Sequence, residues 1–124
     1  MSPEPDETLL RKAEQLLVSG QSADAAASLA PLAHRLPKAD GIQLLTARAF
    51  RDSGNTELAL ARYKAAAAVS KSADVWREFV IELLKAGQKS RARKAAAQAP
   101  VRGEAKKSLL ALAKSGLRTT AAAS

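Results

Sequence analysis

The chain contains no cysteine, few aromatic residues and no long apolar run. Without cysteine it has no disulfides, no thiolate metal ligands and no cysteine nucleophile, which is consistent with a reducing compartment. No apolar segment approaches the length needed to span a bilayer, so we expect no transmembrane segment. The first seven residues are acidic and polar, unlike the basic and then apolar start of a secretory signal. We therefore expect a soluble, cytoplasmic protein.

The shortage of aromatic and β-branched residues favours helices over strands. Only four of the 124 residues are aromatic, whereas alanine occurs 29 times. Alanine has the highest helix propensity and little preference for strands. A chain of this length has room for one domain. The composition therefore predicts a single all-α domain with closely packed helices.

Residues that could carry catalysis or hold a metal are scarce. His34 is the sole histidine, and with no cysteine available it has no partner ligands for a metal site. The glycines are single and do not form a phosphate-binding loop. We interpret His34 as a residue near a helix C-terminus, where the helix dipole favours it, and Trp76 as a residue of the core or its edge rather than a ligand platform. The sequence thus predicts a protein that is not an enzyme and that needs no cofactor or metal.

The net charge of +8 is unevenly distributed. Residues 1–70 contain eight Lys and Arg and eight Asp and Glu, which cancel. Residues 71–124 contain twelve Lys and Arg and only four Asp and Glu. The whole positive excess therefore belongs to the C-terminal half.

Three glycines mark an internal repeat. Gly20, Gly54 and Gly87 are 34 and 33 residues apart, and each follows an amphipathic segment and precedes an alanine-rich one. A glycine directly after a periodic apolar segment is a typical helix C-terminal signal. Because another helical segment begins within two residues, each glycine predicts a tight turn between two antiparallel helices.

The pattern predicts six helices in three hairpins, followed by a seventh helix. The expected ranges are 5–19, 22–35, 39–53, 55–69, 72–86, 88–99 and 103–115. We expect Pro31 to kink the second helix and Ser72 to cap the fifth. The seventh helix is interpreted as a cap over the last hairpin, with Lys106, Lys107 and Lys114 facing water; a degenerate fourth repeat is the alternative. Residues 117–124 are expected to be a disordered tail.

Small and large residues recur at fixed distances from the three glycines. An alanine stands five residues after each one, and large apolar residues stand four residues before. With these positions the chain resembles the tetratricopeptide repeat family, whose motif residues match here at Ala25, Ala59, Tyr63, Trp76, Ala92 and Pro37. Lys71 and Ala96 depart from the motif. The resemblance implies a domain over residues 1–116, with repeats at about 5–37, 39–71 and 72–100 stacked into a short right-handed solenoid of antiparallel hairpins.

The resemblance also implies where a partner would bind. In such solenoids the first helix of each hairpin lines a concave groove. The groove positions implied for this chain are Leu10, Glu14, Leu44, Arg48, Arg51, Arg77, Ile81 and Lys85. We expect this groove to bind a partner protein or peptide with apolar and acidic groups, so that the chain acts as an adaptor or scaffold. The oligomeric state stays open.

A second candidate surface is the basic C-terminal third. Its residues are Lys89, Arg91, Arg93, Lys94, Arg102, Lys106 and Lys107. Such a cluster attracts anions and could assist an acidic protein partner, or meet nucleic acid or an anionic membrane. Nucleic-acid binding through this surface is the alternative function, although no stacking aromatic or reading module lies near it.

Overall fold

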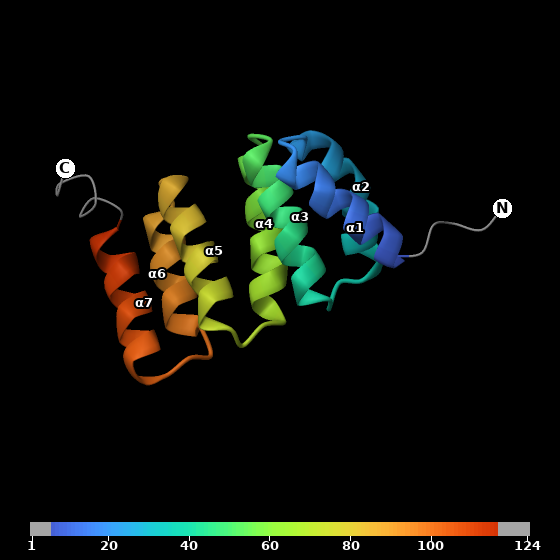
Figure 1. Cartoon of the computed structure of the whole chain (residues 1–124). Coiled ribbons are helices and arrows are strands. Elements are labelled where there is room, and N and C mark those ends of the chain that lie inside the picture. Colours follow the sequence, from blue (N-terminus) through green and yellow to red (C-terminus); the bar gives the residue numbers. More distant parts are fainter. Residues whose placement is uncertain (1–5, 117–124) are drawn as a thin grey trace. The chain divides into compact units, whose positions relative to one another are not determined.

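The structure, a computed structural model, describes residues 6–116 and shows seven α-helices and no strand in that range (Figure 1). The helices are α1 (Asp6–Val18), α2 (Ser22–Arg35), α3 (Asp40–Asp52), α4 (Thr56–Ala68), α5 (Ala73–Lys85), α6 (Lys89–Gln98) and α7 (Gly103–Ser115). The all-α prediction is confirmed, and each helix end lies within one residue of the predicted end. The expected disordered tail, 117–124, lies outside the described residues.

The helices form two compact units. Unit 1, within Met1–Val69, contains α1 to α4, and unit 2, within Ser70–Ser124, contains α5 to α7. In unit 1 each helix packs against the next along the chain, and in unit 2 α6 and α7 pack together while α5 contacts both. The charge divides at the same place, because the balanced half of the sequence forms unit 1 and the basic half forms unit 2. The single domain inferred from the repeat stays a prediction.

The three hairpin turns have the same backbone geometry. Gly20, Gly54 and Gly87 have φ angles of 81°, 87° and 77°, in the left-handed region that an L side chain rarely adopts. In the middle turn the Gly54 N–H donates to the Arg51 carbonyl at 3.0 Å, and the Asn55 N–H donates to the Phe50 carbonyl at 2.9 Å. The same two bonds occur at the other two turns. This is the Schellman arrangement, which satisfies carbonyls at the end of a helix.

Small residues allow the two helices of each hairpin to approach closely. The residues that stand seven before and five after each glycine are Ala13 with Ala25, Ala47 with Ala59, and Val80 with Ala92, and all six are buried. In unit 1 the two alanines of the first pair belong to one core cluster with Leu29. In unit 2 α6 buries only alanines along its length, so its packing depends on α5 and α7.

A polar side chain connects the first hairpin to the helix that follows it. The chain leaves α2 before Pro37, which has no N–H to offer the preceding carbonyls. Gln43, the fourth residue of α3, supplies donors instead: its Nε2 donates to the Ala33 carbonyl at 2.7 Å and to the Leu36 carbonyl at 3.0 Å. Gln43 is fully buried, and its Oε1 accepts a hydrogen bond from Arg62 of α4 at 3.1 Å.

Unit 2 contains the same connection at α7. Pro100 follows α6, and Lys106, the fourth residue of α7, donates to the carbonyls of Ala96 at 3.0 Å and Ala99 at 2.9 Å. These acceptors lie ten and seven residues before Lys106, the same separations as for Gln43. The same spacing of hydrogen bonds therefore joins α7 to α6 and α3 to α2. The sequence prediction that Lys106 faces water is wrong, because its ammonium group binds these carbonyls and the side chain is half-buried.

Other sequence predictions differ in detail from the structure. Ser72 stands at the N-cap of α5, but its side chain makes no capping hydrogen bond. Trp76 is buried, and its Nε1 donates to the Ser70 carbonyl at 3.0 Å, so it is a core residue at the start of α5. Pro31 lies inside α2 without ending it, and His34 is exposed in the last turn of that helix.

Candidate functional site

The first helices of the two hairpins in unit 1 form a groove. A pocket of about 500 Å³ lies between α1 and α3. Its lining residues are Leu10, Glu14, Ala39, Asp40, Gly41, Ile42, Leu44, Leu45 and Arg48. Four of the residues that the resemblance assigned to a groove, namely Leu10, Glu14, Leu44 and Arg48, are thus brought together. We call this pocket the α1–α3 groove.

The floor of the α1–α3 groove is the edge of the hydrophobic core. Leu10 and Leu45 are half-buried and pack against the core cluster that contains Ala13 and Leu29. Because the core holds these leucines, the apolar floor is fixed in place rather than formed by mobile surface side chains. The lining also carries opposite charges, with Glu14 on α1 and Arg48 on α3.

Arg51, a predicted groove residue, forms hydrogen bonds within its own hairpin. Its Nη1 donates to the hydroxyl of Tyr63 at 2.9 Å, and its Nε donates to Asp52 at 2.9 Å. Tyr63 is fully buried and lies in the middle of α4, so the arginine joins the C-terminal end of α3 to the middle of α4. Arg51 does not line the α1–α3 groove.

The remaining predicted groove residues belong to unit 2. Arg77, Ile81 and Lys85 succeed one another at intervals of four along α5, as the sequence indicated. Ile81 is half-buried, and Arg77 and Lys85 are exposed. Lys85 forms an ion pair with Glu82 at 3.3 Å. These residues therefore form a stripe on a different unit from the α1–α3 groove.

Most residues of the predicted basic surface are exposed. On α6 these are Lys89, Arg91, Arg93 and Lys94, and Arg102 and Lys107 lie at the start of α7. Lys106 is the exception described above. The sequence did not identify Lys114 and Leu84 as partners of this surface, although both line a pocket together with Lys89 and Arg93. Their contribution depends on the packing of α7 beside α5 and α6, which no local sequence signal specifies.

The described residues contain no arrangement that points to metal chemistry. Between residues 6 and 116, His, Asp and Glu side chains do not gather in groups of three or more that could hold a metal ion. None of the helices in the same range combines the length and the apolar character needed to cross a bilayer.

Comparisons with known proteins give no relative from which a function could be transferred. No family model matches the sequence, and no curated protein matches it at a significant level. The function therefore has to be argued from the geometry of the two units.

Proposed function

We propose that the chain is a non-catalytic interaction module of the tetratricopeptide repeat type, which binds a segment of a partner protein in the α1–α3 groove. One observation carries the proposal. Leu10, Glu14, Leu44 and Arg48, which come from the first helices of two successive hairpins, line one pocket. Concave pockets with an apolar floor and a few convergent polar groups are the usual form of a binding site.

The assignment to this repeat type is supported by features that recur from hairpin to hairpin. The three Schellman turns are 34 and 33 residues apart, and a buried pair of small residues follows the same register in each hairpin. The connecting segments 36–39, 69–72 and 99–102 also have equal lengths of four residues. Each recurring feature is local, so a repeated sequence unit accounts for all of them.

The lining of the α1–α3 groove defines the chemistry of its ligand. Leu10, Ile42 and Leu44 favour an apolar side chain, which would be removed from water on binding. Arg48 favours a carboxylate, because a guanidinium can donate two parallel hydrogen bonds to it. Glu14 and Asp40 favour a basic or amide group nearby. We propose a peptide with an apolar anchor flanked by both charge signs.

Gly41 offers a way to fill the α1–α3 groove without disturbing the fold. It lines the groove near the start of α3, and a Cβ added there meets no atom within 4 Å. A side chain can therefore start from this backbone position in open space, and Gly41→Phe should gain helix propensity, since glycine is among the poorest helix formers. A matched control is Ala61→Phe, which adds the same ring to an exposed position of α4 outside the groove.

The test is selection of random peptides displayed on phage against the immobilised full chain. We expect enriched peptides to share an apolar anchor, to lose at least about tenfold in affinity for Gly41→Phe, and to bind Ala61→Phe as they bind the wild type. A tenfold loss corresponds to about 1.4 kcal/mol, which one occluded apolar anchor supplies. If no peptide is enriched, or if both variants bind equally well, the groove is not the binding site.

A further inference from the structure

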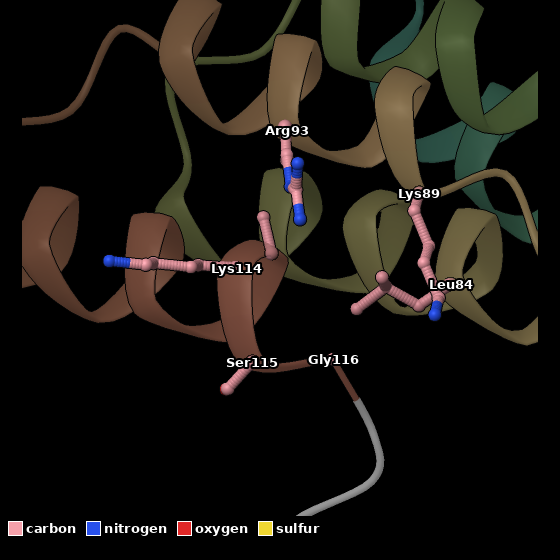
Figure 2. A pocket seen from close by; sticks show the side chains of 7 residues that line it. Leu84, Lys89, Arg93, Lys114, Ser115 and Gly116 are labelled. Carbon is pink, nitrogen blue, oxygen red and sulfur yellow. The ribbon is translucent and has the colours of Figure 1, made fainter.

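Unit 2 contains a pocket that is separate from the α1–α3 groove. It has a volume of about 450 Å³ and lies where the C-terminal end of α5 and the N-terminal half of α6 meet the C-terminal end of α7. Its lining includes Leu84, Lys89, Arg93 and Lys114 (Figure 2). A hollow of about 400 Å³ shares Arg93 and Lys114 with it and adds Leu110. We call the two together the basic pocket.

The charges around the basic pocket are of one sign. Lys89, Arg93 and Lys114 contribute three cations, and no acidic residue lines either hollow. Figure 2 shows Arg93 pointing from α6 toward α7 and Lys89 lying beside Leu84, whereas Lys114 points away from both. Two cations are therefore directed into the space and the third lies at its rim.

The sequence of α6 makes this concentration of charge unfavourable for the isolated helix. Its first turn contains no acidic residue, and its N-cap, Gln88, makes no side-chain capping bond. Lys89, which lines the pocket, thus stands near the positive end of the helix dipole. An anionic ligand beside α6 would relieve this repulsion, so the charge pattern favours a partner that carries negative groups.

The basic pocket also exposes apolar surface, which excludes a simple anion as the best ligand. Leu110 is 42% exposed, and Leu84 is half-buried in the pocket wall. A phosphate or a nucleic-acid backbone would pair with the cations but leave these leucines in water. No aromatic residue lines either hollow, so stacked bases would find no platform. A ligand with both carboxylates and an apolar side chain satisfies the whole lining.

The cations and the apolar surface of this pocket meet because α7 packs against both α5 and α6. α7 places the exposed Leu110 in the same hollow as Arg93 of α6 and contributes Lys114. We propose that the basic pocket is a second binding site, which accepts an acidic, leucine-containing segment of a partner protein. This site does not depend on the α1–α3 groove, since all of its residues belong to unit 2.

The chain provides matched variants for a test. Arg93→Gln with Lys114→Gln removes two charges that line the basic pocket. Arg91→Gln with Lys107→Gln removes the same residue types from the same two helices, at exposed positions outside the pocket. Both double variants change the net charge equally. All four side chains are exposed, so the fold should tolerate each change.

The probe is a short synthetic peptide of Glu and Leu with blocked ends, titrated into the full chain and followed by fluorescence anisotropy and amide chemical shifts. A peptide with Gln in place of Glu and a single-stranded oligonucleotide serve as comparisons. We expect the acidic peptide to shift amides of α6 and of the C-terminal half of α7. Its affinity should fall about tenfold in the pocket variant, through lost charge-assisted hydrogen bonds, and stay within about twofold in the control variant.

Leu110→Ala tests whether the apolar surface of the basic pocket contributes to binding. This exposed side chain can be truncated without creating a cavity in the core. We expect it to weaken the acidic peptide severalfold while leaving any oligonucleotide binding unchanged. The proposal is overturned if the acidic peptide does not bind, if it binds no better than the Gln peptide, or if the two double variants lose affinity equally. Tighter binding of the oligonucleotide than of the peptide would also overturn it, and would assign the surface to nucleic acid.

Discussion

Replacing Gln43 with leucine should destabilise unit 1 far more than a surface substitution does. The Gln43 side chain is fully buried, and its Nε2 donates to the carbonyls of Ala33 and Leu36. Gln43→Leu keeps the approximate volume but removes both donors and the acceptor of Arg62. The Leu36 carbonyl keeps a main-chain donor, the Ala39 N–H at 3.1 Å, so the principal loss is at the buried Ala33 carbonyl.

The expected magnitude follows from these contacts. A buried carbonyl left without a donor costs about 1–3 kcal/mol, and the part-buried guanidinium that loses its acceptor adds about 1 kcal/mol. The added apolar surface of leucine returns roughly 1 kcal/mol. We therefore expect the free energy of unfolding to fall by about 1–3 kcal/mol.

The assay is urea denaturation followed by far-ultraviolet circular dichroism, with amide exchange to locate the loss in α2 and α3. Gln15→Leu is the control, because Gln15 is exposed on α1 and its replacement should change stability by less than about 0.5 kcal/mol. If Gln43→Leu were as stable as this control, the buried amide would not hold the second hairpin against the first. Loss of protection confined to unit 2 would refute the reasoning equally.

Three further predictions concern single residues, each measured by the same denaturation assay. Gly54→Ala should lower the free energy of unfolding by about 1–2 kcal/mol, because alanine rarely adopts a φ of 87°. Gly41→Ala, in regular helix, should be neutral or stabilising. Equal effects of the two substitutions would contradict the turn assignment. Trp76→Phe keeps an aromatic ring but loses the N–H that donates to a buried carbonyl. We therefore expect the free energy of unfolding to fall by about 1–2 kcal/mol, and an unchanged stability would contradict this role. Lys106→Met should lower the free energy of unfolding by about 1–2 kcal/mol, whereas Lys107→Met at the exposed neighbouring position should lower it by less than about 0.5 kcal/mol. Similar values would mean that the hydrogen bonds of Lys106 to α6 do not contribute to stability.

The helices and turns could be predicted from the sequence because their causes are local. A glycine after an apolar helical segment specifies a Schellman turn with little help from distant residues, and Gly20, Gly54 and Gly87 all behave in this way. The buried small pairs follow from the repeat register. Four residues of the α1–α3 groove were also predicted, because the resemblance implies that the first helices of the hairpins line a groove.

The residues that the sequence analysis misplaced or did not single out are polar groups whose roles depend on tertiary packing. Gln43 has no sequence mark of burial, yet it supplies donors to the end of a helix that a proline follows. Lys106 resembles its neighbour Lys107 in sequence, but only Lys106 reaches the carbonyls of α6. Arg51 is spaced correctly for the groove and instead binds Tyr63 within its own hairpin. Such choices are decided by which acceptor lies within reach after the helices have packed.

The proposal that this chain binds protein rather than nucleic acid is tested most directly by affinity capture with the full chain at about physiological salt. The lysate is divided into nuclease-treated and untreated halves, and wild type, Gly41→Phe and Ala61→Phe are used in parallel. We expect a defined protein that survives nuclease treatment, is lost with Gly41→Phe and is retained with Ala61→Phe. The proposed function would be contradicted if the bound material is lost on nuclease treatment, or if it binds Gly41→Phe as well as it binds the wild type.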